Sequence, residues 1–337
     1  MDSQSADSDE LARTWDERPE IIRAFIEIRP QYEHLCSEID YILRKRMNDH
    51  NIEFSTITSR AKTLKSFTEK LSRKQYDEPL KNVTDLAGVR LVYLYKSDRP
   101  DIEKIIEAEF EVIEMVDKVE EQEVDKFGYG ALHYLVNLGR KSSGARYDDL
   151  KGLICEIQVR TVLQDAWAII DHHLSYKHES DVPKVLKRKL NSLSGLFETA
   201  DDQFDRVRKE QEEYRQTIKS TLNSRSKFLE QETNLDTFTE FLKWKFPKKK
   251  SARDNRHLSR ILSLALSFDY DKLSELNKLL KRTQKARAAM RAERSVLFAA
   301  SEVARAMALE HKSYRESETW VEPTRKLFAK YDHLLSE

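Results

Sequence analysis

Two carboxylates at the edges of apolar runs are the residues of this chain best suited to chemistry. Asp85 precedes the apolar run Val89–Leu94, and Glu156 lies within a second run, Leu153–Val159. An acidic side chain on a β-type segment is costly to bury unless a cation or a proton transfer uses it. Two carboxylates near a phosphate chain can hold Mg²⁺, or one of them can accept the proton of an attacking hydroxyl group. With the basic residues around them, they predict a magnesium-dependent nucleotide enzyme.

Both carboxylates also have a purely structural interpretation. Asp85 can cap a helix or a turn, with Gly88 as the turn residue. This interpretation is weaker for Glu156, because a strand period of two places Gln158 and Arg160 on the same face. A strand face of Glu, Gln and Arg lines a polar site more often than it packs in a core, so the pattern favours a binding face.

An aromatic residue between glycines lies in the segment that connects the two runs. Tyr129 follows Gly128 and precedes Gly130, so its ring can stack on a nucleotide base, a contact that contributes ~1–3 kcal/mol. Packing of the ring against the edge of a sheet explains the residue equally well. His133 follows in the same segment and is expected to hydrogen-bond the substrate.

A basic segment precedes the first carboxylate. The range Ser59–Leu71 is expected to form a helix, with Lys62, Lys65 and Lys70 close to one stripe. The chain contains neither a P-loop nor a dinucleotide-binding GxGxxG motif, so basic side chains would have to hold a triphosphate in place of loop amides. Alone, such a stripe is more typical of a solvated helix face, but beside the carboxylate motifs it is a candidate phosphate clamp.

The elements that must position these residues form a mixed α/β centre between helical flanks. All seven glycines lie between Gly88 and Gly195, and the flanks are rich in residues that favour helices. Strands are predicted over Val89–Leu94, Phe110–Val116, Leu132–Leu138 and Leu153–Val159. Helices are predicted over Pro19–Met47, with a break or kink at Pro30, and over Asp101–Glu109, Thr161–Tyr176 and Val185–Tyr214. This order predicts an α+β fold.

From Lys219 onward the pattern is helical throughout. Apolar residues at helical spacing predict helices over Leu258–Phe268, Tyr270–Leu280, Ala286–Leu309 and Pro323–Leu335. Three consecutive lysines, Lys248 to Lys250, are interpreted as part of a solvated loop. A contact with phosphate or RNA is the alternative.

Composition limits the class of protein. The 337 residues suffice for two or three domains with a full core. The formal net charge is +0, so no global charge favours nucleic acid. No apolar run reaches the roughly 20 residues of a membrane span, and the polar N-terminus is unlike a signal peptide. Cys36 and Cys155 are too few for a disulfide framework, so we expect reduced thiols and a cytoplasmic protein without membrane contact.

Five ordered motifs resemble those of the RelA/SpoT alarmone synthetases, especially the small alarmone synthetases. The resemblance covers roughly Phe54–Lys177. In order, the motifs are Ser59–Lys62 with Lys65 and Ser66, Asp85–Arg90, Gly128–His133, Glu156–Thr161 and Trp167–Lys177. Because they occur together and in this order, they are far more specific than any one of them alone.

The resemblance implies a nucleotidyltransferase-like mixed sheet flanked by helices and followed by an all-helical region. It implies transfer of pyrophosphate from ATP to the 3′-hydroxyl group of GDP or GTP, which makes the alarmone (p)ppGpp. In this scheme Asp85 binds Mg²⁺, and Glu156 serves the attacking hydroxyl group and also contacts the metal. The ATP-binding residues would be Arg60, Lys62, Lys65, Ser66, Lys70 and Arg90. The residues that hold the acceptor nucleotide would be Tyr129, stacked on guanine, with His133, Gln158 and Arg160.

Two features depart from the family. Gly130 follows the stacking tyrosine, where the family often has a basic or polar residue, and the His-Asp motif of a family-type hydrolase domain is absent. No breakdown of the alarmone is therefore expected. Some relatives are toxins that pyrophosphorylate the 3′ end of tRNA or make adenosine alarmones, and the basic cluster Lys245–Arg260 is the support for tRNA here. A catalytically inactive nucleotide-binding regulator is the alternative of another class.

We expect the domains to follow the change in composition. A disordered tail is predicted over 1–17, the synthetase domain with its helical flanks over 18–218, and a helical accessory domain over 219–337. The apolar faces of the tail helices must pack on something. The synthetase domain and a second subunit are the two candidates, so a homo-oligomer is among the expectations.

Overall fold

The computed structural model describes residues 17–74, 76–117, 130–174, 184–317 and 319–335. The chain divides into two compact units, here called unit 1 (residues 1–207) and unit 2 (residues 208–337). The division falls within helix α7 (Lys184–Thr221), which also contains the expected domain boundary at 218/219. Each unit has its own hydrophobic core.

Unit 1 is built on a five-stranded mixed sheet formed by the described residues, with strand order β1-β2-β5-β4-β3. Strands β2 and β5 are parallel, and the other neighbouring strands are antiparallel. The strands are β1 (Phe54–Ala61), β2 (Ala87–Tyr93), β3 (Phe110–Asp117), β4 (Leu132–Leu138) and β5 (Cys155–Thr161). The four predicted strands are therefore confirmed, and β1 is a strand that the sequence patterns did not indicate.

Helix α2 (Pro19–Asp49) crosses the sheet and carries much of the core of unit 1. Pro30 lies inside this helix on an exposed position, and the helix continues through it, so of the predicted break or kink the break is wrong. Proline removes one backbone hydrogen bond. Both halves of the helix are nevertheless anchored by buried apolar side chains, including Phe25 before the proline and Leu35 and Ile39 after it, and this burial stabilises one continuous helix.

The predicted helix Ser59–Leu71 is wrong in its first part. Residues up to Ala61 complete β1, and helix α3 (Leu64–Arg73) begins after the N-cap residue Thr63, whose side chain accepts a hydrogen bond from the Ser66 backbone N–H at 3.2 Å. The β-branched residues of β1 favour a strand, and Thr63 supplies the helix start. In α3, Phe67 stacks on Phe25 of α2, with ring centroids 4.3 Å apart.

The remaining elements of unit 1 follow the predicted order. Helix α5 (Arg99–Glu109) lies between β2 and β3, and α6 (Val162–Leu174) follows β5, as expected. Thr161 and Gln164 form the start of α6, because each side chain bonds the other's backbone N–H, at 2.8 and 3.1 Å. The short elements are α4 (Pro79–Asn82), η1 (Lys96–Asp98) and η2 (Asp148–Leu150).

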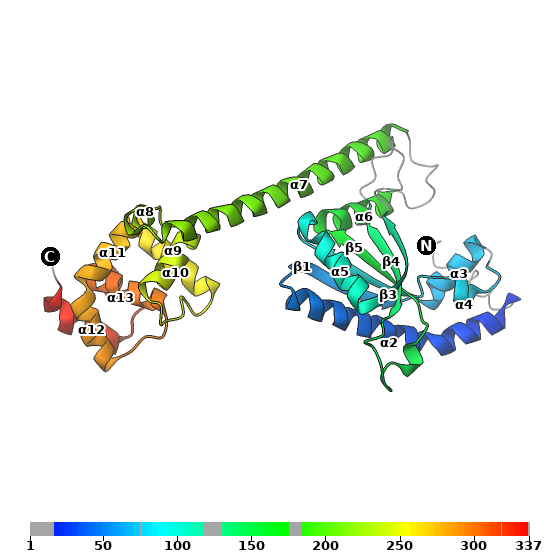
Figure 1. Cartoon of the computed structure of the whole chain (residues 1–337), viewed down its shortest axis with the longest axis horizontal. Helices are drawn as coiled ribbons and strands as arrows, with labels where there is room; N and C mark the ends of the chain where they lie inside the picture. Colours follow the sequence, from blue (N-terminus) through cyan, green and yellow to red (C-terminus); the bar gives the residue numbers. More distant parts are fainter. Residues whose placement is uncertain (1–16, 75, 118–129, 175–183, 318, 336–337) are drawn as a thin grey trace, which may run out of the picture. The chain divides into compact units, whose positions relative to one another are not determined.

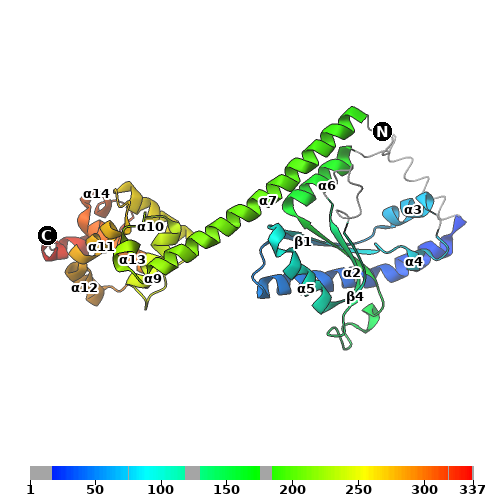
Figure 2. The same cartoon turned by 45° about the horizontal axis from the view of Figure 1, so that its top comes forward.

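The two faces of the sheet differ in chemistry. Ile57, Leu91 and Ile157 belong to the face that joins the core with α2 and α5. Helix α2 lies against one side of the sheet, and α6 lies on the other (Figures 1 and 2). The side covered by α2 is apolar, so the polar residues of the strands lie on the side of α6.

Unit 2 is helical throughout its described part, apart from isolated β-bridges. After α7 its helices are α8 (Arg225–Leu229), α9 (Leu235–Lys245), α10 (Asn255–Ser267), α11 (Leu273–Arg282), α12 (Gln284–Glu293), α13 (Ala299–Glu310), α14 (Lys312–Arg315), α15 (Glu322–Tyr331) and the turn η3 (Asp332–Leu334). The predicted fold class, a mixed sheet flanked by helices and followed by an all-helical region, is confirmed.

The predicted helix Ala286–Leu309 is divided in two. Helix α12 ends at Glu293 and α13 begins at Ala299. Between them Phe298 forms a β-bridge with Lys250, and the Ala299 N–H donates to the Lys250 carbonyl group at 2.9 Å. The residues between α12 and α13 are not helical, because this segment pairs with Lys250 instead.

Cys36 and Cys155 are buried free thiols. In the part of the chain that the structure describes, no helix combines the length and the apolar character needed to cross a membrane.

Candidate functional site

The strand register brings the predicted site residues onto the polar face of the sheet. Arg60 of β1 pairs with Gly88 of β2, which pairs with Glu156 of β5. One step along the strands, Arg90 pairs with Gln158, which pairs with His133 of β4. Residues directly opposite in a sheet share one face, so these residues form two adjacent rows on it.

Glu156 is held by two side chains of this face. His133 Nδ1 lies 2.8 Å from Glu156 Oε1, and Gln158 Nε2 donates to Glu156 Oε2 at 2.9 Å. Arg160 Nη2 in turn donates to Gln158 Oε1 at 3.2 Å. The predicted polar face of Glu156, Gln158 and Arg160 is thus a connected hydrogen-bond network, which fixes the orientation of the carboxylate.

The environment of Glu156 favours its ionised form. Burial acts to raise its pKa, but the hydrogen bonds from His133 and Gln158 lower the pKa below the ordinary value of a glutamate. Its side chain is 20% exposed. An ionised carboxylate that solvent can reach can accept a proton from a bound hydroxyl group.

Asp85 lies in the turn before β2 and forms two ion pairs with the basic segment. Lys62 Nζ is 2.7 Å from Oδ2, and Lys70 Nζ is 2.8 Å from Oδ1. Burial acts to raise the pKa of Asp85, and the two lysines lower it below the ordinary value of an aspartate. One carboxylate and two candidate phosphate-binding lysines therefore form one cluster.

The charge of Asp85 also acts to raise the pKa of Glu156, against the two hydrogen bonds. Among the described residues, no group of three or more His, Cys, Asp or Glu side chains is arranged to hold a metal ion. Two partly exposed carboxylates still suit Mg²⁺, which is commonly held by one or two carboxylates together with waters and substrate phosphates. The donor chemistry is therefore compatible with magnesium.

Gly88 leaves space between Arg60 and Glu156. A Cβ atom built at Gly88 would meet only the Arg60 carbonyl oxygen within 4 Å, at 3.9 Å. Because Gly88 lies between Arg60 and Glu156 in one row of the sheet, this strip of the polar face carries no side chain. A flat group can approach the backbone here.

Asp165 is a residue of this region that the sequence patterns did not indicate. It lies in the first turn of α6, and its Oδ1 is 3.1 Å from Arg90 Nη1 and 3.8 Å from Arg160 Nη1. Burial and the charge of Arg90 lower the pKa of Arg160. An acidic residue in the first turn of a helix is favoured by the helix dipole. The position of Asp165 near the start of α6 was therefore the one sequence signal that could have pointed to it. The ion pair with Arg90 depends on the fold and could not be predicted.

The remaining predicted ATP-binding residues, Arg60, Lys65 and Ser66, lie in β1 and α3. Lys62 precedes the N-cap of α3, so it does not share a helical stripe with Lys65 and Lys70 as predicted. Lys65 has a side chain that is 57% exposed, and its Nζ lies 4.0 Å from Glu69. Ser66 receives a hydrogen bond from Thr63 Oγ1 at 3.1 Å, and Arg60 is exposed. Tyr129 lies outside the described residues, so its role stays a prediction.

Comparison with known proteins confirms the resemblance in the first part of the chain. Residues 59–181 match the family model described as the region found in RelA and SpoT proteins. This range contains the polar face described above and ends before unit 2. The part of the chain that matches this family model therefore lies within unit 1.

Two curated relatives come from Bacillus subtilis strain 168. GTP pyrophosphokinase YjbM is 28% identical over 170 residues, which cover 49% of this chain and 77% of the relative. GTP pyrophosphokinase YwaC is 27% identical over 158 residues, which cover 45% of this chain and 72% of the relative. Among solved structures, small alarmone synthetase 1 of Bacillus subtilis is 24% identical, with a TM-score of 0.48, over 56% of this chain and 98% of that one.

Proposed function

We propose that this protein transfers pyrophosphate from ATP to the 3′-hydroxyl group of GDP or GTP and so makes (p)ppGpp. The observation that carries the proposal is the held carboxylate Glu156 on the polar face, inside the segment that matches the RelA/SpoT region. Two relatives named GTP pyrophosphokinases support the same reaction.

In the proposed reaction, Glu156 accepts the proton of the attacking hydroxyl group. The 3′-oxygen forms a bond to the β-phosphorus of ATP, the bond from that phosphorus to the α,β-bridging oxygen breaks, and AMP leaves. His133 and Gln158 hold the two oxygens of Glu156, at 2.8 and 2.9 Å. They fix the carboxylate before the substrate arrives, and such preorganisation is a main source of catalysis.

The cluster around Asp85 is proposed to hold the triphosphate of ATP. Asp85 and Glu156 would hold Mg²⁺, which neutralises charge on phosphate oxygens when it is bound. Lys62 and Lys70 already lie 2.7 and 2.8 Å from Asp85, so they can turn from the carboxylate to phosphate oxygens without a large displacement. Arg60 and Arg90 are proposed to contact the adenine on either side of the strip left open by Gly88.

The proposal is tested by incubating the protein with ATP, Mg²⁺ and either GDP, GTP, an adenosine nucleotide or tRNA, and separating the products by chromatography. We expect AMP and a guanosine 3′-pyrophosphate with GDP or GTP. Glu156→Gln keeps the size of the side chain but removes the base, and general-base catalysis contributes about 10²–10⁴-fold, so the rate should fall by that factor.

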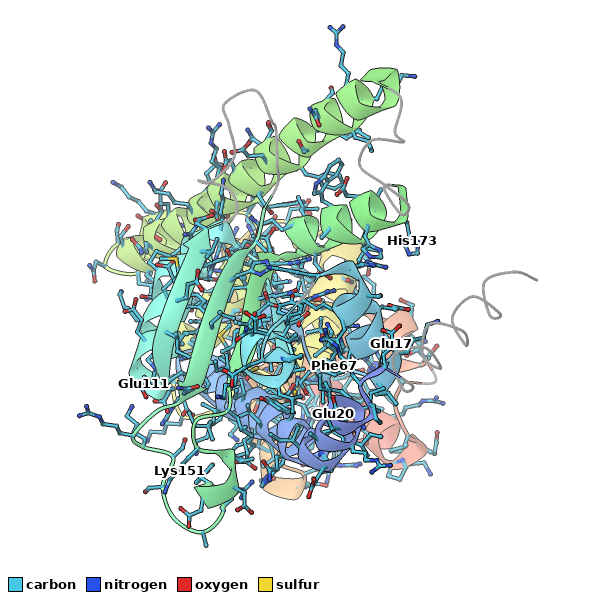
Figure 3. All side chains as sticks on the ribbon, turned by 90° about the vertical axis from the view of Figure 1, so that its right-hand side faces the viewer. Glu17, Glu20, Phe67, Glu111, Lys151 and His173 are labelled. Atoms are coloured by element: carbon cyan, nitrogen blue, oxygen red, sulfur yellow. The ribbon has the colours of Figure 1, made fainter. Side chains whose placement is uncertain are left out.

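Glu111→Gln is the matched control, because Glu111 is an exposed glutamate on the edge strand β3 (Figure 3). It should leave the rate unchanged. Transfer to tRNA or to an adenosine nucleotide, with none to GDP or GTP, would replace the proposed acceptor. Binding of nucleotides without AMP release would indicate an inactive regulator.

A further inference from the structure

A carboxylate in the core of unit 2 is surrounded by basic residues. Glu302 of α13 is 0% exposed. Its Oε2 lies 3.0 Å from Arg287 Nη1, and its Oε1 lies 3.2 Å from Lys249 Nζ and 3.7 Å from Arg291 Nη1. The sequence pattern predicts that Lys248–Lys250 is part of a solvated loop. Lys249 of this segment instead forms an ion pair with a buried carboxylate.

Arg287 alone is sufficient to balance this carboxylate. Its Nε donates to Thr283 Oγ1 at 3.1 Å, and its Nη2 donates to the Leu280 carbonyl oxygen at 2.7 Å. With Nη1 on Glu302, each nitrogen of the guanidinium has an acceptor. The guanidinium of Arg287 is thus fully paired. Glu302 Oε1, by contrast, is buried without a hydrogen bond in the part of the chain that the structure describes, and it faces Lys249 and Arg291 at ion-pair distance. One carboxylate therefore lies among more positive charges than it can balance.

Arg305, one helical turn after Glu302, is the cation that remains unpaired. It is 2% exposed, and its Nε and Nη1 atoms are buried without an acceptor among the described residues. Burial lowers its pKa, and the charges of Arg294 and Arg291 act in the same direction, against Glu302. A buried guanidinium with unmet donors is costly, because its lost hydration is not replaced by hydrogen-bond acceptors.

Two further arginines, Arg291 and Arg294, are near enough for their charges to act on Arg305, and Arg291 Nη1 lies 3.7 Å from Glu302, three residues before Arg305. The side chain of Arg291 is 38% exposed, and Arg294 is exposed with its Nη1 2.6 Å from Thr324 Oγ1. Arg294 lies in the segment where the predicted long helix is divided into α12 and α13. The connection between α12 and α13 therefore begins at Arg294, one of these arginines.

We propose that Arg305, Arg291 and Arg294 form a binding site for a small anion that carries phosphate. Phosphate oxygens accept several charge-assisted hydrogen bonds from the planar fork of an arginine. Such an anion would supply the acceptors that Arg305 lacks and would offset the excess positive charge. A small ion or the phosphate end of a nucleotide suits a guanidinium that is 2% exposed, whereas the backbone of a nucleic acid helix is too bulky to reach it.

The test is hydrogen exchange of the backbone amides in residues 284–310 of the full chain. The exchange is measured in chloride and, at equal ionic strength, in inorganic phosphate, pyrophosphate or GTP. A ligand at about nine times its Kd slows exchange through an opening that destroys the site by about tenfold. We expect this slowing with at least one of the three phosphate compounds, and the three arms show which source of phosphate the site prefers.

Three variants locate the effect. Arg305→Met removes the unpaired charge, so it should abolish the anion-dependent slowing and raise the stability of unit 2 in chloride. Arg305→Lys keeps the charge but loses the fork and should bind more weakly. Arg256→Met removes an exposed arginine of α10 in the same unit and should behave as the wild type.

The proposal is overturned if none of the phosphate compounds slows exchange in residues 284–310 of the wild type. It is also overturned if Arg305→Met and the wild type respond equally. The measurement is confined to unit 2 and requires no turnover, so it stands or fails independently of the function proposed for unit 1.

Discussion

Glu156 in unit 1 and Glu302 in unit 2 are both carboxylates held by nitrogen donors, but their surroundings differ. Glu156 is partly exposed, and its partners His133 and Gln158 contribute at most one positive charge. Glu302 is fully buried, and Lys249, Arg287 and Arg291 all lie within 4.0 Å of it. The first arrangement leaves a negative group accessible to a substrate, and the second leaves positive charge in excess.

The comparison shows that the number of ion pairs around a carboxylate does not by itself indicate its role. A reactive carboxylate needs solvent access and partners that leave it ionised. A structural carboxylate in a core needs full compensation, because an uncompensated buried charge is strongly destabilising. Exposure and the balance of charge distinguish the two, and the following changes test that distinction, from the largest expected effect to the smallest.

Asp85→Asn should produce the largest loss of activity. It removes the charge that would help to hold Mg²⁺, and the stabilisation of developing phosphate charge is worth several kcal/mol, which is about a thousandfold in rate. AMP release at saturating ATP and GTP, at a temperature where the variant is folded, measures the effect. A variant that keeps most of its turnover would exclude Asp85 from the metal site.

Glu302→Gln should reduce stability rather than chemistry. The change leaves the buried Arg287 without its carboxylate partner, which costs about 3–5 kcal/mol. Faster hydrogen exchange across α13 measures the loss, while AMP release by unit 1 should be retained at a temperature where the variant is folded. An unchanged exchange rate would show that the basic cluster does not depend on this carboxylate.

Tyr129→Ala should weaken use of the acceptor nucleotide, as the resemblance implies. Loss of a stacking contact of ~1–3 kcal/mol lowers kcat/KM for GDP or GTP by about 5- to 150-fold. Tyr129→Phe keeps the ring and should be milder. If both variants are equally impaired, the hydroxyl group rather than the ring face is important.

Asp201 of α7 provides an effect on stability alone, which depends on pH and vanishes toward low pH. It is buried like Glu302 and accepts a hydrogen bond from Thr161 Oγ1 at 2.6 Å, but its acidic neighbours are Asp202 and Asp205. Burial raises the pKa of Asp201 to about 7, above the ordinary value of about 3.9. Between these values the folded state binds more protons than the unfolded state, so the free energy of unfolding should fall by about 1.4 kcal/mol per pH unit as pH rises.

Asp201→Asn should remove this contribution, because the amide does not titrate and can still accept from Thr161. Urea denaturation of both proteins between pH 5 and pH 8 measures the difference. The two stabilities should converge toward low pH, with the variant increasingly the more stable as the pH approaches 7. Parallel curves across this range would show that Asp201 is ionised throughout.

Much of the fold could be predicted from local patterns. The four predicted strands and the helices α5 and α6 depend on short periodic segments bounded by turn residues, and they were confirmed. Strand β1 was missed because its polar side chains, including Arg60, lie on one face and were interpreted with the basic helix that follows. The continuity of α2 through Pro30 depends on packing against the sheet, which no local pattern reports.

The sequence by itself determined that Asp85, Glu156 and the basic residues around them occur in ordered motifs. These motifs were sufficient to predict the matching region and the chemistry expected of it. Only the tertiary structure decided which of them meet. Strand pairing placed His133 on Glu156, the turn before β2 placed Lys62 and Lys70 on Asp85, and α6 brought Asp165 to Arg90. The same holds for Arg305, which as sequence is one arginine of a helix, because burial is a property of the packed chain and not of the residue.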